Sequence, residues 1–566
     1  AKSPLTGGFG EAEAGGFWGP ELKGAGFDAV IVEGVADTPV YLYINDGSVE
    51  FKDASHLWGK TTQEAQSRIR EELGDRAVRV LQIGPAGENL VKFACIVNEL
   101  KHANGRCGLG AVMGSKRLRA IAVRGHKRPE MADPERIREL RTWFAKRAKE
   151  HAGLVLHSRL GTSKGVLPLN ASGILPTRNF QEGQFEGAAS ISGEEMEKKL
   201  LTGTGTCYGC PVACKRVVSS TEGYQIDPEY GGPEYETIGT LGSGCGVRDL
   251  AAVCKANELC NAYGMDTISA GLTVAFAMEC FERGLLSRSQ TDGIDLRFGN
   301  GEAVVTLIEK MAFREGIGDL LANGSREAGR EIGGSAMDYA NQVKGQEFPA
   351  HEPRAKWGVA LGYAVSPTGA DHLQAAHDLW FEKDLPANAD WITLHDLKPL
   401  GLLEPVPAQS IGPDKVRMFT YLQDIWGLVN VLDLCIFVAA PEFSAYSLNQ
   451  IADMVEAASG WNTSLAELQK MGERGVNMAR CFNIREGFGF ADDKLPPRLH
   501  EPLRGGPFEG YSIPRGDFDE AVRLYYQMRN WELPNGIPTR GKLLELDVKW
   551  LAEMMDEWRK VRESVE

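Results

Sequence analysis

The N-terminal part of the chain alternates apolar and polar positions in short runs, a pattern typical of half-buried β-strands. Such runs occupy residues 28–34 (DAVIVEG), 39–46 (PVYLYIND) and 48–53 (SVEFKD), with Gly, Pro and Asn-Asp-Gly turn signals between them. Two further β-like runs follow at Val78–Gly84 and Ala120–Gly125. The pattern therefore predicts a strand-rich first unit that ends near residue 126.

From Asp133 onward the apolar positions recur with the helical period instead. Pro134–His151 is charged and amphipathic, and Leu250–Gly284 is one long helical run that ends in a glycine stop. Polar, turn-rich stretches near Gly333–Asn341 and Leu385–Gln409 are candidate boundaries or surface insertions. We expect the rest of the chain to be mostly helix punctuated by Gly and Pro.

Composition narrows the class of protein. The 566 residues are 43% hydrophobic and carry a net charge of -15, so a nucleic-acid partner would need a local basic patch against an unfavourable mean field. Nucleic-acid binding is therefore not expected. The longest apolar stretches, such as Leu428–Ala440, contain polar residues and fall short of the roughly 20 residues that a bilayer requires, so we expect no membrane span.

The cysteine count points to metal chemistry. Eleven cysteines in a long chain without a recognisable signal peptide favour free thiols and metal ligands in a reducing cytoplasm over a disulfide framework. The chain begins at Ala1 without a Met, directly in turn-rich sequence, and we expect a segment upstream of it.

Three cysteines, Cys207, Cys210 and Cys214, form a C-x2-C-x3-C motif that lets one loop direct three thiolates at one point. Thiolates are the ligands that iron–sulfur clusters and zinc prefer. A structural zinc site would normally bring a second C-x2-C or a pair of histidines, which the chain lacks, and unliganded buried thiols are the remaining alternative. One distant cysteine as the fourth ligand suits an iron–sulfur cube better, but spacing does not select which cysteine it is.

A glycine-rich run, GRCGLGAVMGSKRLRAIAVRG, leads into the last predicted strand, which forms its end. Its glycines at 108, 110 and 114 stand just before Lys116, Arg117 and Arg119, and exposed backbone amides beside cations can bind phosphate. The spacing fits neither a Walker A loop nor a dinucleotide-binding loop. A phosphate site and a packing turn are equally supported by these residues.

Taken together, the motifs resemble the tungsten-containing aldehyde ferredoxin oxidoreductase family over essentially the whole chain. The stretches that carry the resemblance are GGFWGPELKGAGFDAVIVEG, RCGLGAVMGSKRLRAIAVRG, CYGCPVAC, GGPEYETIGTLGSGCG, NAYGMDTISAG, SPTGADHL, NVLDLC and RCFNIREGFGFADDKLPPR. The resemblance implies an α+β fold, with a β-rich N-terminal base domain followed by two mostly α-helical domains that enclose the cofactor. We place these domains at 1–127, 128–338 and 339–566.

The resemblance also implies the cofactors: a tungsten or molybdenum ion held by two pterins, Mg²⁺ bridging the pterin phosphates, and one 4Fe–4S cluster. The glycine loop would contact those phosphates through Gly108, Gly110, Ala111, Gly114 and Lys116. Two pterin-binding motifs fall at Asn261–Asp266 and Asn430–Cys435. The second motif supplies Cys435 as the fourth cluster ligand beside the three cysteines above.

This chain departs from the family pattern at several positions. Asn261 and Asn430 stand where Asp is usual, and Asp433 replaces a Gly, which weakens the expected pterin contacts there. Glu13 stands where the family often has Asn before the Gly-Gly pair, which changes the expected Mg²⁺ environment.

For the reaction, the resemblance implies oxidation of aldehydes to carboxylic acids with water as the oxygen source. Glu236 in GGPEYET is the expected proton acceptor, with Glu234 as the fallback; an exposed or ion-paired glutamate is the alternative for either. His372 in SPTGADHL is the expected hydrogen-bond partner of the metal oxo ligand or of the aldehyde oxygen, with His377 second.

Partners and rival functions follow from the same resemblance. Electrons are expected to leave to ferredoxin or a small ferredoxin-like subunit, with a flavin subunit beyond it, and an oligomer is expected. The rivals are a benzoyl-CoA-reductase-like subunit that reduces an aromatic ring, a non-catalytic electron-transfer subunit with a decayed pterin site, and a sugar-acid or other specialised oxidoreductase.

Overall fold

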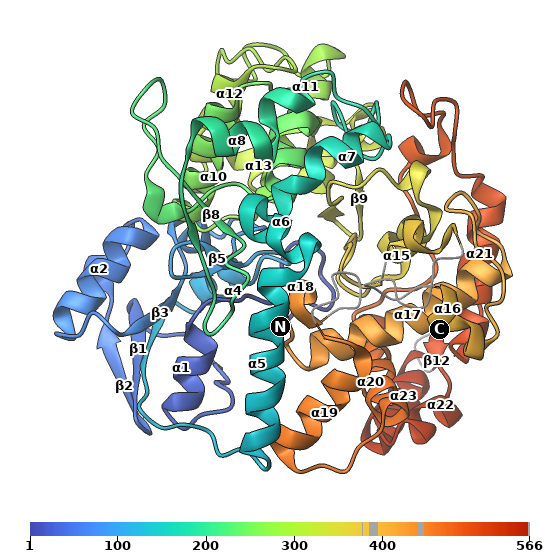
Figure 1. Ribbon diagram of the computed structural model, residues 1–566. Helices are drawn as coiled ribbons and strands as arrows, with labels where there is room; N and C mark the ends of the chain where they lie inside the picture. The colour runs from blue at the N-terminus through green and yellow to red at the C-terminus, as the bar shows by residue number, and fades with distance from the viewer. Residues whose placement is uncertain (376, 384–393, 440–445, 564–566) are drawn as a thin grey trace.

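The computed structural model describes residues 1–375, 377–383, 394–439 and 446–563. The chain runs from a β-rich N-terminal part through a helical middle part to a C-terminal group of helices, and the three parts meet near the centre of the molecule (Figure 1). This confirms the α+β prediction, while the domain boundaries at 127/128 and 338/339 stay a prediction. Of the predicted turn-rich stretch Leu385–Gln409, residues 385–393 lie outside the described residues.

A six-stranded mixed sheet forms the N-terminal part, in the order β2-β1-β6-β3-β4-β5. Only β1 and β6 pair in parallel, whereas the other neighbours are antiparallel. The strands of this sheet are β1 (Val40–Asn45), β2 (Ser48–Asp53), β3 (Arg79–Gln82), β4 (Ile96–Asn98), β5 (His102–Asn104) and β6 (Leu118–Arg124). The predicted strands at 39–46, 48–53, 78–84 and 120–125 are therefore confirmed.

Because side chains alternate along these strands, the strands contribute to two hydrophobic cores, one on each face of the sheet. Tyr41 of β1 packs on one face, where helix α2 contributes Ala65 and Ile69. Leu42 of β1 packs on the other face, where helix α1 contributes Leu22. Helices of this part are α1 (Trp18–Gly24), α2 (Thr62–Glu72), α3 (Pro85–Glu88) and α4 (Leu109–Ser115).

The prediction of a strand at residues 28–34 is wrong. Val30 and Val32 are partly buried against the core that contains Leu22, whereas Ile31 between them is 86% exposed. The segment thus has the side-chain alternation of a strand, but within the described residues it pairs with no neighbouring strand. A ladder needs a partner with unpaired backbone groups, which sequence alternation alone does not supply.

The middle part is mainly helical, as predicted. Helix α5 begins at Pro134 and ends at Glu150, and Asp133 caps it by accepting hydrogen bonds from the first-turn amides. Its helices are α5 (Pro134–Glu150), α6 (Ala152–Leu160), α7 (Val166–Ala171), α8 (Gly193–Lys199), α9 (Tyr235–Thr237), α10 (Leu250–Tyr263), α11 (Thr267–Glu282), α12 (Gly301–Phe313), α13 (Ile317–Leu321) and α14 (Ser325–Ile332). A hairpin of β7 (Leu201–Gly205) and β8 (Lys215–Val218) carries the cysteine loop between its strands.

The single helical run predicted over Leu250–Gly284 is instead two helices, α10 and α11. Gly264 ends α10 with a φ of +74°, a left-handed conformation that favours glycine. Asp266 then caps α11 by accepting hydrogen bonds from the amides of Ile268 and Ser269. The break places Asp266 in the interior, close to the candidate site described below.

The C-terminal part packs helix α17 along α20, and they approach so closely at Gly472 that a β-carbon there would lie 2.0 Å from the carbonyl oxygen of Asp424. Its helices are α15 (Trp357–Val365), α16 (Leu394–Leu397), α17 (Pro413–Val431), α18 (Ile436–Ala439), α19 (Leu448–Ser459), α20 (Leu465–Arg485), α21 (Arg515–Met528), α22 (Arg540–Glu545) and α23 (Lys549–Glu563). The short strands β9 (Gln342–Val343) and β10 (Gln346–Glu347), and β11 (Trp531–Glu532) and β12 (Ile537–Pro538), form two small antiparallel pairs. No helix among the described residues has the length and apolar character needed to cross a bilayer.

A buried ionic cluster centres on Asp493. Its carboxylate lies 2.6 Å from the amine of Lys344 and 2.7 Å from the guanidinium of Arg480, and it also accepts a hydrogen bond from the hydroxyl of Tyr526. Burial alone would raise the pKa of Asp493, but the neighbouring Arg480 and Lys344 charges lower it, so the carboxylate is ionised at neutral pH. Asp493 and Arg480 both lie in the family-like stretch RCFNIREGFGFADDKLPPR, so charge balance in the interior gives that stretch a structural role.

We predict that Asp493→Asn destabilises the protein, because it leaves two buried cations without a carboxylate. Breaking a buried ion pair from one side typically costs about 3–5 kcal/mol. The measurement is the thermal unfolding midpoint of the purified protein, which should fall by several degrees or more. Asp453→Asn is the matched control, since Asp453 pairs with Arg136 where both side chains are more than 40% exposed. Equal midpoints for the two variants would contradict the prediction.

Candidate active site and cysteine quartet

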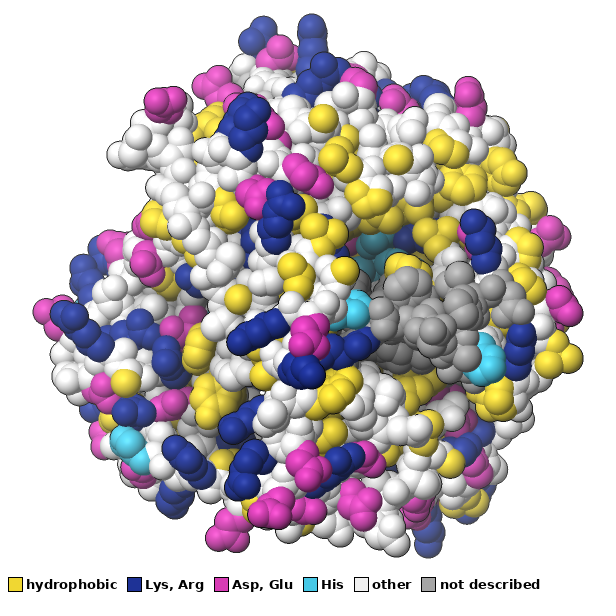
Figure 2. Space-filling view, in the orientation of Figure 1, with side chains coloured by type: hydrophobic (Ala, Val, Ile, Leu, Met, Phe, Trp, Pro, Cys, Tyr) yellow, Lys and Arg dark blue, Asp and Glu magenta, His cyan; other side chains and the backbone are white. Residues whose placement is uncertain are grey.

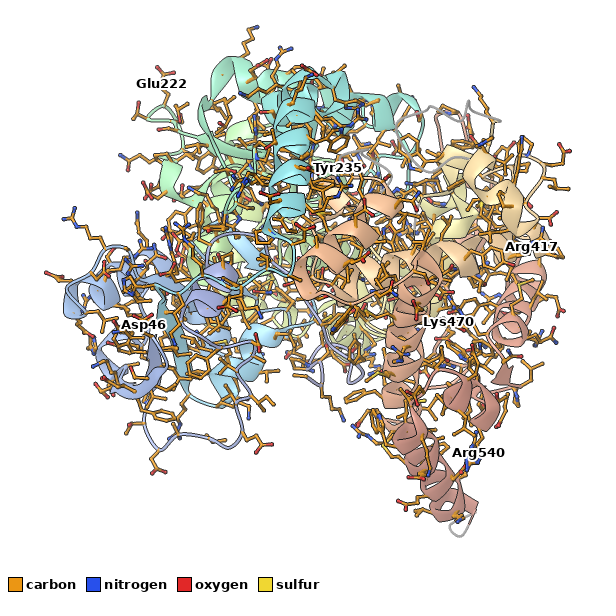
Figure 3. All side chains as sticks on the ribbon, turned by 60° about the horizontal axis from the view of Figure 1, so that its bottom comes forward. Asp46, Glu222, Tyr235, Arg417, Lys470 and Arg540 are labelled. Carbon is orange, nitrogen blue, oxygen red and sulfur yellow. The ribbon has the colours of Figure 1, made fainter. Side chains whose placement is uncertain are left out.

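The candidate site lies in the interior, where the three parts of the chain meet. In Figure 3 the labelled Asp46, Glu222 and Arg540 lie at the periphery in different parts of the molecule, whereas Tyr235, the neighbour of Glu236, lies in the densely packed interior. Tyr235 is 5% exposed, and its hydroxyl donates to the carbonyl of Ala350 at 2.7 Å. On the surface, a hollow with histidine side chains in its wall is visible in Figure 2.

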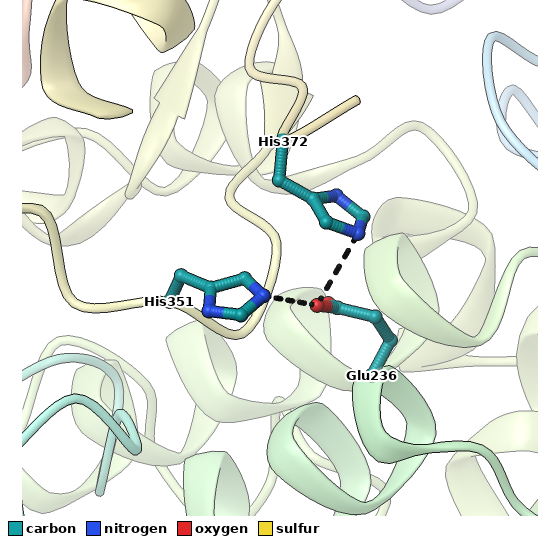
Figure 4. A group of neighbouring side chains, drawn as sticks. All are labelled: Glu236, His351 and His372. Carbon is teal, nitrogen blue, oxygen red and sulfur yellow. Dashed lines mark ion pairs between the residues drawn. The ribbon is translucent and has the colours of Figure 1, made fainter. Parts of the chain in front are cut away.

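Glu236 faces two imidazoles across this site (Figure 4). Its Oε1 lies 3.2 Å from Nε2 of His351 and 3.5 Å from Nε2 of His372, while its Oε2 accepts a hydrogen bond from the backbone amide of Ala350 at 2.6 Å. Among the described residues, no donor makes a hydrogen bond to the buried Oε1. The carboxylate is therefore fixed by one oxygen and free to accept a proton on the other.

The facing histidines are neutral at neutral pH. Burial lowers the pKa of His372 and lowers that of His351 well below its usual value, and the nearby Lys356 charge acts in the same direction on both. Neutral imidazole has one N–H donor and one acceptor nitrogen. The site can therefore orient a carboxylate and a substrate oxygen without adding cationic charge.

Lys356 determines which nitrogen of His351 carries the proton. Its amine lies 3.0 Å from Nδ1 of His351 and 3.0 Å from Nδ1 of His377. Because an ammonium group only donates, both Nδ1 atoms must accept, and the proton of His351 is left on the Nε2 that faces Glu236. His377 thus lies next to Lys356 rather than against Glu236.

The ligand atoms of Glu236, His351 and His372 all lie within 4.8 Å of one another, a spacing that could hold a metal ion. A metal needs the unprotonated lone pair of each imidazole, however, and the hydrogen bond from Lys356 keeps Nε2 of His351 protonated. The hydrogen bond from Lys356 therefore argues against a resident cation at this group.

Glu234, the alternative carboxylate, points into a different environment. Its Oε1 lies 2.8 Å from the amine of Lys215, and its Oε2 accepts a hydrogen bond from the hydroxyl of Thr162. Burial would raise the pKa of Glu234, but Lys215 outweighs it and the pKa is lowered. Glu234 is thus the ion-paired glutamate of the motif, and Glu236 is the one that faces the histidines.

The four predicted cluster cysteines come together. Cys207, Cys210 and Cys214 lie on the loop between β7 and β8, and Cys435 lies in the segment between α17 and α18. The thiol of Cys435 interacts electrostatically with those of Cys207 and Cys210, and the thiol of Cys214 with those of Cys207 and Cys435. Cys210 and Cys214 also pack against the same hydrophobic core as Leu432 and Leu434, which precede Cys435 in the sequence.

The spacing of the thiols bears on the choice of metal. Four sulfurs around one zinc ion, with bonds of about 2.3 Å, would lie less than 4 Å apart. In the part of the chain that the structure describes, no three cysteine sulfurs lie within 4.8 Å of one another. Burial raises the pKa of Cys214 to about 12 and of Cys435 to about 11, so these thiols ionise only when a cation binds them. The spacing suits a larger cluster better than single zinc.

A glycine pair lies against the cysteine loop. A β-carbon on Gly15 would lie 2.6 Å from the sulfur of Cys207, and Gly16 accepts a backbone hydrogen bond from Tyr208 at 2.9 Å. On the same side, Nδ1 of His102 lies 3.7 Å from the sulfur of Cys207. The N-terminal part of the chain thus closes one side of the cysteine quartet.

The glycine loop is used mainly for packing. A β-carbon on Gly114 would lie 1.9 Å from the carbonyl oxygen of Gly87, and one on Gly110 would lie 2.4 Å from that of Cys95. Gly108 adopts a φ of +72° at the start of α4, and the amide of Ala111 bonds back to it at 3.0 Å. Lys116 is half-buried, and its amine donates to the carbonyl of Gly34 at 3.1 Å. These contacts favour the packing alternative, and a phosphate contact stays a prediction.

The first predicted pterin motif spans the junction of α10 and α11, and the second lies between the end of α17 and the start of α18. In the first, the side chain of Asn261 donates to the carbonyl of Tyr230, and Asp266 lies 3.4 Å from Nε of Arg106. In the second, the side chain of Asn430 contacts the carbonyl of Leu373 at 3.5 Å. Asp433 is exposed with a φ of +51°, a conformation more natural to the Gly that the family pattern has there.

Sequence reasoning missed three residues that the structure places at the site: His351, Lys356 and Arg106. Arg106 donates to the carbonyls of Ala370 and Glu347, both at 2.6 Å, and so connects the N-terminal part to the segment that carries His372. No local pattern marks these residues, because each acts through partners far away in the chain. The signal that could have drawn attention to Arg106 is the family-like stretch RCGLGAVMGSKRLRAIAVRG, which begins at that residue.

Comparisons with known proteins agree with this geometry. The family model of the aldehyde ferredoxin oxidoreductase N-terminal domain matches residues 1–125, and that of domains 2 and 3 matches residues 139–548. The chain is 40% identical over 561 residues to a tungsten-containing aldehyde ferredoxin oxidoreductase of Pyrococcus horikoshii, covering 97% of this chain and 86% of that protein. A protein of the same description from Thermococcus kodakarensis is 39% identical over 559 residues, with the same coverage.

Among solved structures, the active-site complex BamBC of benzoyl coenzyme A reductase bound to 1,5-dienoyl-CoA has a similar fold, with a TM-score of 0.81 and 26% identity. The match covers 99% of this chain and 87% of that one. Two family models and relatives of up to 40% identity thus match nearly the full length of the sequence, and the chain belongs to the aldehyde ferredoxin oxidoreductase family of oxidoreductases.

Proposed function

We propose that this oxidoreductase converts aldehydes to carboxylic acids with water as the oxygen source, at a tungsten bis-pterin centre. The observation that carries the proposal is the buried Oε1 of Glu236, which accepts no hydrogen bond from the described residues and faces two neutral histidines. The relatives that are named tungsten-containing aldehyde ferredoxin oxidoreductases support the substrate class and the metal. Molybdenum in place of tungsten is the alternative metal.

The residues fit the cofactors that the family implies. The cysteine quartet offers four soft ligands at a spacing too wide for zinc, which suits one 4Fe–4S cluster held by Cys207, Cys210, Cys214 and Cys435. Asn261, Asp266, Asn430 and Asp433 would contact the pterins, and the glycine loop would bind their phosphates together with Mg²⁺. When bound, the metal–pterin group supplies an acceptor for an electron pair.

The protein's own residues would then handle the protons. Oxidation of an aldehyde with one water releases two electrons and two protons in addition to the acid. Glu236 would accept a proton from the attacking water, with its Oε2 held by the amide of Ala350. His372 would donate a hydrogen bond from Nε2 to the aldehyde oxygen, and His351 would keep the carboxylate of Glu236 in place.

Electrons would leave through the cluster to ferredoxin or a small ferredoxin-like subunit, with a flavin subunit beyond it, and the enzyme would work as an oligomer in the cytoplasm. A cluster held by the quartet would let an electron pair leave as single electrons, which such a carrier can accept. Cys435 is exposed as a residue, although its thiol is buried enough to raise its pKa, and Cys207 and Cys210 are half-buried, which supports an exit close to the surface.

Benzoyl-CoA-reductase-like ring reduction is the second candidate, favoured by the 0.81 TM-score to the BamBC complex. The higher identity to the aldehyde enzymes, 40% against 26%, ranks it below aldehyde oxidation. A parallel assay of anaerobically purified protein, with aldehydes and a dye acceptor in one arm and an aromatic CoA thioester with a reductant in the other, decides between them. Metal analysis for W, Mo, Fe and Mg tests the non-catalytic alternative, which predicts iron without tungsten or molybdenum.

We predict that Glu236→Gln lowers aldehyde turnover by roughly 10²- to 10⁴-fold, because the amide keeps the shape of the side chain but loses the proton-accepting oxygen. The measurements are turnover with a saturating aldehyde and the tungsten and iron contents of the protein. The metal contents should stay at the wild-type level. Glu222→Gln, on the surface, is the control. Unchanged turnover would remove Glu236 from the mechanism.

A second prediction concerns the cluster. Cys435→Ser should lower the iron content from about four per chain and abolish electron transfer from aldehyde to ferredoxin, since the quartet loses a soft ligand. Iron analysis and low-temperature EPR of the reduced protein are the measurements. Cys280→Ser, which changes a buried thiol within α11, is the matched control. A full iron complement with normal electron transfer in Cys435→Ser would show that another residue is the fourth ligand.

A further inference from the structure

The cysteine quartet lies beside one ion pair that the reaction above does not use. Lys215 directly follows Cys214 and begins strand β8, and its amine lies 2.8 Å from Oε1 of Glu234. About a quarter of each side chain is exposed, at 24% and 29%. Glu234 is held from its other oxygen by the hydroxyl of Thr162, which also accepts the amide of Tyr235 at 2.9 Å. Glu234 is therefore held at both carboxylate oxygens, which fixes its place beside Lys215.

Both charges of this pair act on the thiols. The Lys215 ammonium interacts electrostatically with Cys207, Cys214 and Cys435, which are three of the four cysteines of the quartet. Glu234 acts on Cys214 with the opposite sign. The other polar neighbour, His102, is neutral, because burial first and the Lys215 and Lys101 charges next lower its pKa to about 3. It can therefore offer a hydrogen bond but no charge.

A charge at this position matters for electron transfer. Reduction of an iron–sulfur cluster adds one electron and hence one negative charge, with no change in its atoms. A nearby cation stabilises the reduced form and raises the reduction potential, whereas a nearby carboxylate lowers it. Two opposite charges held at a fixed separation thus act against each other on the same cluster.

We infer that the Lys215–Glu234 pair sets the reduction potential of the cluster bound by the cysteine quartet, with Glu234 offsetting the cation so that the electron is passed on rather than retained. The inference rests on the proposed function in one respect, namely that the quartet holds an iron–sulfur cluster. Both residues act through the cluster and are positioning residues.

The position of Glu234 adds a connection to the reaction site. Glu234 precedes helix α9 and Glu236 lies within it, and residues two apart on a helical turn point to different sides. One short segment therefore holds the charge that tunes the electron exit and the carboxylate that accepts the proton. Glu234 and Glu236 can therefore be replaced one at a time, so that a variant changes either the charge near the cluster or the proposed proton acceptor.

The test is a redox titration of the cluster, followed by EPR, in the intact protein and its variants. Glu234→Gln leaves the Lys215 charge without its counterion and should raise the potential. Lys215→Met removes the cation beside the cluster and should lower the potential. Each shift should correspond to roughly a tenfold or larger change in the equilibrium constant for one-electron reduction, where tenfold is 59 mV. The double variant Lys215→Met/Glu234→Gln should return close to the wild-type potential.

Two controls separate charge from structure. Thr162→Val removes a hydrogen bond to Glu234 but keeps both charges, so it should move the potential much less than either charge variant. Glu473→Gln breaks a comparable Lys–Glu pair, formed with Lys542 at 2.7 Å among the C-terminal helices, and should leave the potential unchanged. If Lys215→Met does not fold, Glu234→Gln measured against these two controls still shows whether removing the carboxylate raises the reduction potential.

The failures of the two proposals are distinguishable. Wild-type protein with no iron cluster would overturn the cluster assignment itself. A wild-type cluster whose potential is unchanged by both single variants, or shifted in the same direction by both, would overturn the role of the ion pair and leave aldehyde oxidation untouched.

Discussion

Two carboxylates of one short segment meet opposite electrostatic environments, and the arrangement of the whole site depends on this contrast. Glu234 lies beside a lysine and beside the cysteine quartet, while Glu236 faces neutral imidazoles in the interior. The ion-paired carboxylate is held ionised, and the other keeps an oxygen that accepts no hydrogen bond from the described residues. Since the segment is held by hydrogen bonds with Thr162 and Ala350, its place fixes the separation between the carboxylate beside the cysteines and the carboxylate that faces the histidines.

The interior around this segment is built from balanced charges rather than from apolar packing alone. Arg106 joins the N-terminal part to the segment before His372 through two backbone carbonyls, and it also lies beside Asp266. Farther out, Arg498 pairs with Glu279 at 2.7 Å where both are buried. Buried ionic groups cost stability unless they are paired, so each pair restricts how the surrounding elements can pack. The precision of the site follows from these constraints.

The comparison with benzoyl coenzyme A reductase shows that one fold serves enzymes of different chemistry. The fold of the BamBC complex matches that of this chain with a TM-score of 0.81, at 26% sequence identity. A shared fold of this kind places the cofactor and the protein around it, whereas the reaction depends on the few side chains that face the substrate. In this chain the proposed ones are Glu236, His351 and His372, which lie close together in the interior.

Local sequence patterns were sufficient for the parts of the structure that depend on near neighbours in the chain. Strand alternation located β1, β2, β3 and β6, the change to helical periodicity after Asp133 located the start of α5, and the spacing of Cys207, Cys210 and Cys214 marked the cysteine loop. The same patterns failed at residues 28–34, where strand pairing needs a partner, and at Gly264, where one conformation divides a helical run in two.

The tertiary structure alone decided the contacts between distant segments. It brought Cys435 to the loop of the other three cysteines, directed Glu234 toward Lys215 and Glu236 toward His351, and placed Lys356 where it sets the proton of His351. Periodicity and spacing report how a residue relates to its near neighbours, because they reflect backbone geometry over a few turns. Which way a side chain points, and which charge it meets there, depends on how segments far apart in the chain pack together.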